Sequence, residues 1–153
     1  MRLTFICVGR LSKEYQAAWR HYEGMLRPYV GVEVLEAPET PLSVGDENAR
    51  CRDAAALLSL LRKGAYAVAL DGRGEQHSSE ELSAFLAGHK LHGRSHFQFL
   101  LGGAAGLDQR VLEAADHCWS LSCLTFPHQM ARCIVLEQLY RAVRIERGEP
   151  YHH

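Results

Sequence analysis

Leu100-Leu101-Gly102-Gly103-Ala104-Ala105-Gly106 joins an apolar run to a glycine-rich turn. The run from 96 to 101 has the length and composition of a buried strand, and residues 107–115 follow as a short helix. Glycines let a backbone approach a ligand closely, and the start of a helix offers unpaired N–H groups. The spacing G-G-x-x-G departs from the dinucleotide fingerprint G-x-G-x-x-G, so a tight strand-to-helix turn and a ligand loop are both open interpretations.

Strand and helix signals alternate on both sides of this segment. Strands are predicted at 2–8, 30–37, 65–70, 96–101 and 118–121. Helices are predicted after Ser12 as far as Pro28, from Asp46 to Gly64, from a Ser78–Glu81 capping box to Gly93, at 107–115 and at 128–147. Residues 71–74, Asp-Gly-Arg-Gly, are predicted to form a turn. This order predicts one α/β domain over residues 1–153 with a mainly parallel sheet, whose ligand crevice lies beyond the carboxyl ends of the strands.

The composition indicates an ordinary globular protein, with 47% hydrophobic and 23% charged residues and a net charge of −1. The charge lacks the basic excess of an autonomous RNA-binding domain, so affinity for RNA would have to come from a local patch, a dimer or the shape of the substrate. Five scattered cysteines without a C-x-x-C pair predict reduced, mostly buried thiols and no metal site. The first apolar run is too short for a signal peptide or a membrane span, so we expect a cytoplasmic protein.

Three loops follow predicted strands and should meet at one edge of the sheet. They are residues 70–74, 101–106 and 120–128. The third loop is unusually apolar for a connection, since exposed loops are normally polar. Leu124 and Phe126 are expected either to cover an adenine ring or to plug the core.

Several motifs in one order resemble a known family. They are Leu101-Gly102-Gly103-x-x-Gly106, Trp119-Ser120-Leu121-Ser122, Thr125-Phe126-Pro127-His128, Glu137-Gln138-x-Tyr140-Arg141-Ala142 and the ending Pro150-Tyr151-His152. The set resembles the RlmH family of the SPOUT superfamily, methyltransferases that act on N3 of a pseudouridine in large-subunit 23S ribosomal RNA. The resemblance covers the whole chain, including the opening Cys7-Val8-Gly9.

The resemblance implies a carboxyl-terminal trefoil knot, S-adenosylmethionine as cofactor and a homodimer acting on the ribosome or large subunit. Carried over by motif, the implied cofactor-binding residues are Leu70, Gly103, Ser122, Cys123, Leu124, Thr125, Phe126 and Pro127. Ala104-Ala105 stands where relatives often carry a polar or acidic residue, which puts a side-chain contact at that position in doubt. The last helix has more than one apolar stripe, which indicates either deeper burial or contact with a partner subunit, and the dimer that the resemblance implies favours the partner.

The chemistry of an imide nitrogen gives a second set of candidates. N3 of a pseudouridine must lose its proton before or during attack, and a nearby positive charge would stabilise the resulting anion. Arg132, Arg141 and His152 can supply that charge, and Tyr151 can stack on a base. We take Arg141, Tyr151 and His152 as the catalytic candidates. The tail can serve the site of its own or of the other protomer, and a disordered end is the alternative.

Two other functions remain as alternatives. One is a nucleotide-binding oxidoreductase, which the missing dinucleotide fingerprint disfavours. The other is a ribosome-associated module that binds RNA without chemistry.

Overall fold

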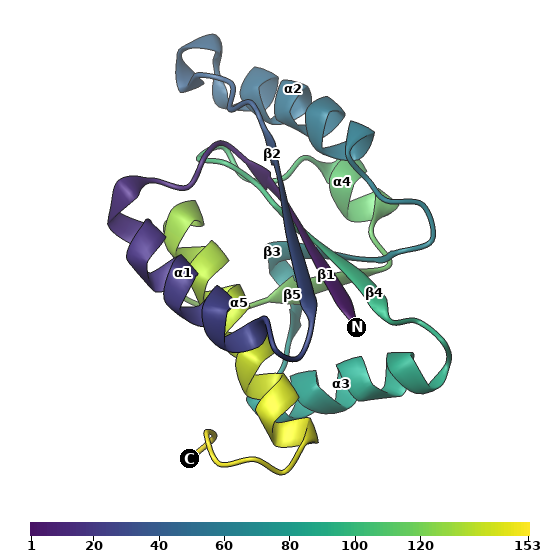
Figure 1. Cartoon of the computed structure of the whole chain (residues 1–153). Coiled ribbons are helices and arrows are strands. Elements are labelled where there is room, and N and C mark those ends of the chain that lie inside the picture. The colour runs from purple at the N-terminus through teal and green to yellow at the C-terminus, as the bar shows by residue number, and fades with distance from the viewer.

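Five parallel strands form the sheet at the centre of the computed structural model, which describes residues 1–153 (Figure 1). They are β1 (Arg2–Val8), β2 (Gly31–Ala37), β3 (Tyr66–Gln76), β4 (His96–Leu101) and β5 (His117–Ser120), in the order β2-β1-β4-β3-β5. The predicted α/β class with a parallel sheet is confirmed. Because all strands run in one direction, the loops that follow them lie at the same edge.

Helices cover both faces of the sheet. Helices α1 (Lys13–Leu26), α3 (Ser79–Leu91) and α5 (His128–Glu146) enclose the larger cluster of buried side chains, whereas α2 (Asp46–Ser59) and α4 (Gln109–Ala114) enclose the smaller one. A short 3-10 helix, η1 (Leu42–Val44), precedes α2. Alternate residues of β1 divide between the two clusters, since Phe5 and Cys7 belong to the larger and Ile6 and Val8 to the smaller. This alternation is the two-residue period of a strand buried on both faces.

The predicted turn at 71–74 is wrong, because β3 continues to Gln76. The β3–β5 register is irregular there: Trp119 pairs with both Leu70 and Glu75, so the residues between them bulge out of the ladder. A Cβ on Gly74 would lie 2.6 Å from the backbone of Cys118. Gly74 therefore allows a close approach between two strands. The second strand lies far along the sequence, so local turn signals do not indicate it.

The apolar second face of α5 is buried within the protomer. The helix packs between α1 and α3 and against the sheet, which buries Val135, Leu136, Leu139, Ala142 and Val143. Packing within the protomer therefore accounts for most of the apolar surface of this helix, whereas Met130 is 38% exposed and Ile134 is half-buried, so contact with a partner subunit stays a prediction.

The helix ends follow the predicted signals in part. Ser78 and Glu81 form the predicted capping box, with both reciprocal hydrogen bonds present. Asp46 is the first residue of α2, and Gly45, at φ 92°, occupies the cap position instead. Ser12 occupies the cap position of α1 without a side-chain cap hydrogen bond.

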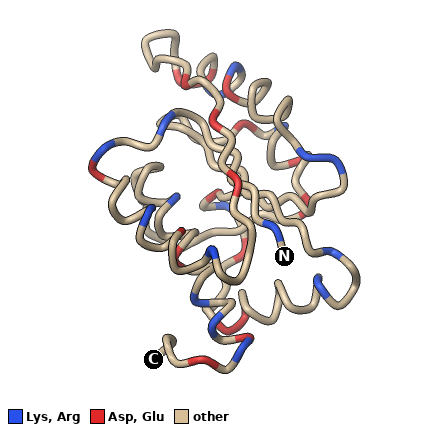
Figure 2. Tube along the Cα trace, viewed as in Figure 1, with Lys and Arg blue, Asp and Glu red and all other residues tan.

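Basic and acidic residues are interspersed over the protein (Figure 2), and the cysteines differ in their burial. Figure 2 shows basic and acidic positions interspersed along the trace. The five cysteines are free, and Cys51 and Cys123 are exposed, which corrects the expectation of mostly buried thiols. None of the helices combines the length and the apolar character that crossing a membrane requires.

Candidate functional site

A cavity of about 390 Å³ opens where the three loops predicted from the sequence meet. Its walls come from the end of β3, the glycine loop after β4 and the loop between β5 and α5. The cavity brings together the following predicted cofactor residues: Leu70, Gly103, Ser122, Leu124, Thr125, Phe126 and Pro127. Cys123 does not line it, since its Sγ instead accepts a hydrogen bond of 3.0 Å from the amide of Gln76.

The glycine loop closes on itself. The N–H of Gly106 donates to the carbonyl of Gly103 at 3.0 Å, and Gly106 has a φ of +81°. A Cβ on Gly102 would lie 2.8 Å from the backbone of Gly106, and one on Gly103 would lie 2.8 Å from Val8 Cγ1 and from the Glu39 carboxylate. The tight strand-to-helix turn is therefore confirmed, and the same loop lines the cavity, so a ligand loop stays a prediction. Close packing against Val8 and Glu39 requires glycine at 103.

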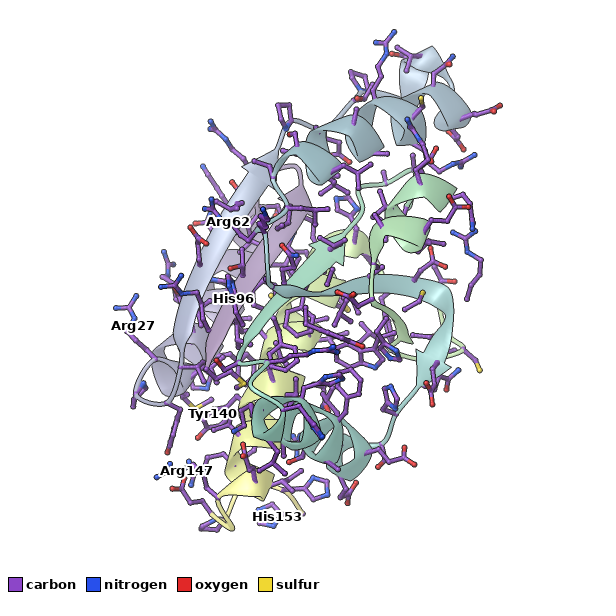
Figure 3. All side chains as sticks on the ribbon, turned by 90° about the vertical axis from the view of Figure 1, so that its right-hand side faces the viewer. Arg27, Arg62, His96, Tyr140, Arg147 and His153 are labelled. Carbon is purple, nitrogen blue, oxygen red and sulfur yellow. The ribbon has the colours of Figure 1, made fainter.

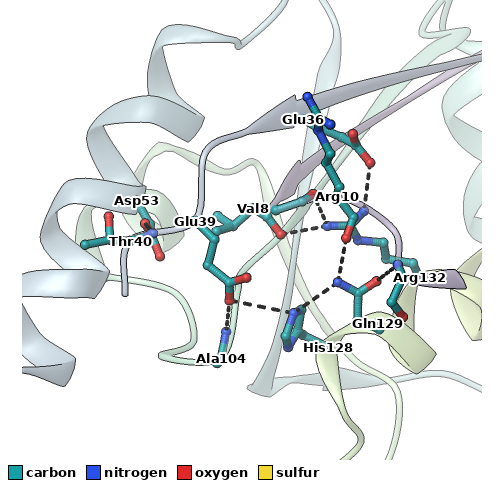
Figure 4. Close-up of polar contacts among 12 residues, drawn as sticks. Val8, Arg10, Glu36, Glu39, Thr40, Asp53, Ala104, His128, Gln129 and Arg132 are labelled. Atoms are coloured by element: carbon teal, nitrogen blue, oxygen red, sulfur yellow. Dashed lines mark hydrogen bonds and ion pairs between the residues drawn. The ribbon is translucent and has the colours of Figure 1, made fainter. Parts of the chain in front are cut away.

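A carboxylate that the sequence analysis missed supports this loop. Glu39 Oε1 accepts a hydrogen bond of 3.1 Å from the N–H of Ala104 and lies 3.8 Å from Nε2 of His128, which begins α5 and lines the cavity (Figure 4). Ala104 has no polar side chain, yet its backbone meets an acidic group from another loop. The sequence could have indicated Glu39, because this residue follows the predicted strand at 30–37 and parallel strands end at the same edge of the sheet.

A second carboxylate lies in the wall itself. Asp71 lines the cavity, and hydrogen bonds from the side chain and backbone of Arg73 hold its pKa below the usual range. Asp71 is therefore an anion at neutral pH, able to accept hydrogen bonds from hydroxyl or ammonium groups of a ligand.

The apolar loop before α5 is shaped by its serines. Ser120 Oγ donates to the carbonyl of Ser122 at 3.1 Å, and Ser122 Oγ accepts from the N–H of Leu124 at 3.0 Å. These bonds leave the Leu124 side chain 72% exposed at the cavity, while Phe126 is half-buried. An exposed leucine at the mouth of a cavity is the arrangement expected of a cover over a planar apolar ligand, not of a core plug.

Arg132 lies on the inner side of this region and is only 1% exposed. Its Nη2 donates to the carbonyls of Val8 and Gly9, both at 2.6 Å, and its Nη1 lies 3.3 Å from Glu36 (Figure 4). The guanidinium therefore ties α5 to the end of β1. The suggestion that Arg132 stabilises a substrate anion does not fit this burial.

The three catalytic candidates form a separate cluster on the last turns of α5 and the tail. Arg141 pairs with Glu137 and lies 4.7 Å over the ring of Tyr151. The Tyr151 hydroxyl donates to Glu137 at 3.1 Å, and burial together with this bond raises the pKa of Tyr151 to about 12. His152 reaches Glu80 of α3 at 2.7 Å, and Figure 3 shows the neighbouring His153 below α3 beside the end of α5.

This cluster does not line the cavity of its own protomer. Ala131 is the last α5 residue at the cavity, and at about 1.5 Å per helical residue Arg141 lies roughly 15 Å further along the axis. The structure thus groups most of the predicted cofactor residues in one place and the catalytic candidates in another.

Comparison with known proteins decides the family. A family model described as predicted SPOUT methyltransferase matches residues 1–152. The chain belongs to the SPOUT methyltransferase family. This SPOUT methyltransferase is 43% identical to each of two proteins named ribosomal RNA large subunit methyltransferase H, one from Pelotomaculum thermopropionicum and one from Symbiobacterium thermophilum. Both alignments cover 99% of this chain, and they cover 98% of the first relative and 99% of the second.

A solved structure supports the fold. The probable methyltransferase from Bordetella pertussis superposes with a TM-score of 0.63 at 17% identity, over 93% of this chain and 94% of that one. At this identity the likeness concerns the fold alone.

The cavity suits the cofactor that SPOUT methyltransferases generally use, S-adenosylmethionine. Its volume falls within the roughly 300–1,000 Å³ of sites for small molecules. It offers apolar side chains for a planar base, backbone groups of the glycine loop for close contact, and the Asp71 carboxylate for hydroxyl or ammonium groups. The residues present therefore fit the cofactor.

Proposed function

We propose that this SPOUT methyltransferase transfers a methyl group from S-adenosylmethionine to N3 of a pseudouridine in 23S ribosomal RNA. The observation that carries the proposal is the end-to-end similarity to proteins named ribosomal RNA large subunit methyltransferase H, in a chain whose three strand-end loops enclose a cofactor-sized cavity. Membership of this family disfavours the oxidoreductase alternative and the alternative of an RNA-binding module without chemistry.

The cofactor supplies an activated methyl group on its sulfonium. We assign its binding to Leu70, Gly103 and residues 122–127, with Leu124 and Phe126 covering the adenine and Cys123 contributing backbone only. These residues orient the methyl group and exclude water, and such positioning is the main contribution an enzyme can make to a direct transfer.

We propose that the enzyme is a homodimer with a shared site. Within one protomer, Arg141 lies roughly 15 Å along α5 from the cavity wall, too far for its side chain to reach a substrate held there. A second copy that places the C-terminal part of its α5 and its tail at the cavity would bring Arg141, Tyr151 and His152 to the substrate. Arg141 would then stabilise the imide anion, and Tyr151 would stack on the base.

We propose the assembled ribosome or large subunit as the substrate, which places the enzyme in the cytoplasm. A charge of −1 with interspersed basic and acidic positions offers few phosphate contacts, so binding to short naked RNA should be weak (Figure 2). The shape of a folded subunit can supply the missing affinity. Family membership also favours the trefoil knot, with the cofactor bound by the knotted loops.

The decisive experiment treats undermethylated ribosomes with the protein and labelled S-adenosylmethionine, and then locates the modified nucleotide. We expect label at N3 of one 23S pseudouridine, and transfer to a short hairpin at a much lower rate. Label elsewhere, or none, contradicts the proposal. Calorimetry with S-adenosylmethionine and with NAD separates the alternatives, since an oxidoreductase would bind NAD and a module without chemistry would bind neither.

A further inference from the structure

A cluster of ligating side chains lies outside the cofactor cavity, where the end of β3 meets the start of β5. It consists of Glu75, His77 and His117, whose carboxylate and imidazole donor atoms all lie within 4.8 Å of one another. None of the three lines the cavity. His77 is half-buried against His117.

The two imidazoles face each other through the same ring nitrogen. His77 Nε2 and His117 Nε2 are 3.0 Å apart, and the rings are nearly parallel at 28°. Two nitrogens at a tetrahedral zinc ion, each about 2.0–2.1 Å from the metal, are about 3.3 Å apart. A movement of a few tenths of an ångström would therefore place an ion between them.

The surroundings hold the two rings in place. Phe85 of α3 stacks on His77 with 5.8 Å between ring centroids and contacts His117 at 4.9 Å, and His89 packs edge-on to Phe85 at 4.6 Å. Glu75 is exposed, so the open side of the cluster faces water. Fixed imidazoles on one side and a carboxylate with solvent access on the other form a site with three protein ligands and a free position.

We propose that Glu75, His77 and His117 bind a divalent transition-metal ion, with zinc as the best match. Two imidazoles and one carboxylate are a ligand set that zinc uses, and water completes the tetrahedron. Each imidazole then carries its proton on Nδ1 and presents Nε2 to the metal. In the metal-free protein one Nε2 donates to the other, which is the arrangement the structure shows.

The bound ion would cross-link two strands. β3 and β5 lose their regular register between Leu70 and Glu75, and pairing resumes only at Glu75 with Trp119. An ion held by residues 75, 77 and 117 would join β3 to β5 across this irregularity, because His117 pairs with Val68 before it and Glu75 pairs with Trp119 after it. Trp119 and Ser120 of β5 line the cavity, so a metal ion that joins β3 to β5 would also restrict the movement of that part of the cavity wall.

The test measures Zn²⁺ binding to the full chain by isothermal titration calorimetry, together with the thermal unfolding midpoint. We expect one ion per chain and a higher midpoint with Zn²⁺. His77→Gln and His117→Gln should each lower the affinity for Zn²⁺ by at least roughly tenfold. Loss of a residue that only supports a metal ligand already costs about that much, and these residues are ligands themselves. Glu75→Gln, at an exposed position, tests the site without disturbing the packed rings. His21→Gln, an exposed histidine on α1, is the matched control and should bind as the unaltered chain does.

Other ligands in the chain give the contrary outcomes. Loss of binding in a variant carrying His152→Gln and His153→Gln, with unchanged binding in His77→Gln, would assign the ion to the tail and overturn the proposal. With Co²⁺ as probe, a thiolate charge-transfer band would assign it to a cysteine, with the same consequence. Absence of Zn²⁺ binding to the unaltered chain would also overturn it. None of these measurements depends on methyl transfer, so the result stands apart from the proposed function.

Discussion

The guanidinium of Arg132 in α5 donates a hydrogen bond of 2.6 Å to the carbonyl of Val8, the last residue of β1. The same nitrogen donates to the carbonyl of Gly9, so one buried side chain satisfies two backbone acceptors at the end of a central strand. Both segments border the cofactor cavity, since Ala131 lines it and Val8 lies against Gly103. The contact therefore fixes the position of α5 relative to the glycine loop.

Replacing Arg132 by methionine should lower the free energy of unfolding by about 2–4 kcal/mol, because the carbonyls of Val8 and Gly9 lose their buried partner. Urea denaturation at fixed protein concentration measures the change. Arg27→Met is the matched control: the Arg27 side chain is 77% exposed and points away from the body of the protein in Figure 3, so its loss should leave stability nearly unchanged. Equal effects of the two substitutions would show that the buried contact does not stabilise the fold.

Shortening Leu124 to alanine should weaken S-adenosylmethionine binding by about tenfold, because the side chain exchanges water for the ligand only when the cofactor binds. Its 72% exposure means that stability without ligand should not change. Calorimetry gives the affinity, and Leu91→Ala, at a leucine 87% exposed on α3, serves as control. Unchanged affinity in Leu124→Ala would remove this loop from the cofactor site.

Alkylation with iodoacetamide at pH 8 should modify Cys51 and Cys123 first and Cys7 only after unfolding. Burial raises the pKa of Cys7 to about 12, so at pH 8 its thiol is protonated, and only the thiolate reacts. Peptide mass spectrometry over time identifies each site. Rapid labelling of Cys7 in the folded protein would contradict the buried position of β1.

The cofactor should protect Cys123 from the same reagent while leaving Cys51 unaffected. Cys123 lies between Ser122 and Leu124, which both line the cavity, and bound cofactor should restrict the loop. Cys51, exposed on α2 beside Arg110, provides an internal control in the same sample. If saturating cofactor leaves both labelling rates unchanged, the proposed site is wrong.

Deleting residues 151–153 should lower methyl transfer by roughly a hundredfold, because it removes His152, a candidate for stabilising the developing charge, together with the stacking ring of Tyr151, while cofactor affinity stays nearly the same. The deletion removes the Tyr151–Glu137 and His152–Glu80 contacts, both far from the cavity of the same protomer. Rates on ribosomes and calorimetry give the two quantities. Full activity of the truncated protein would exclude the tail from the reaction.

Mixing two defective variants tests whether the site is shared. Gly103→Val should collide with Val8 and Glu39 and so displace the glycine loop from the proposed cofactor site, with circular dichroism used to check that the protein remains folded. Combined with tail-deleted protomers, it should restore part of the activity, because a mixed dimer contains one intact cavity and one intact tail. No recovery, once exchange of subunits is verified, would contradict a shared site.

The amino-acid sequence determined the features that depend on neighbouring residues. Apolar runs defined β1 and β4 with the bounds that the structure has, and Ser78 with Glu81 defined the start of α3 through a local capping box. The rule that parallel strands end at one edge placed Gly103 and Leu124 in one cavity. The capping box and the apolar runs depend only on residues close together in the sequence, and the common edge follows from the direction of the strands. Both kinds of information can be read from the amino-acid sequence.

Only the tertiary structure decided which remote residues meet. It extended β3 through a glycine-rich segment because β5 supplied backbone partners, and it buried Arg132 where two carbonyls needed a donor. It brought His77 to His117 across 40 residues, and it separated Arg141 from the cavity along one rigid helix. Distances between residues far apart in the chain are set by packing of whole elements against each other, and hydrophobic periodicity specifies which face is buried but not which partner it meets.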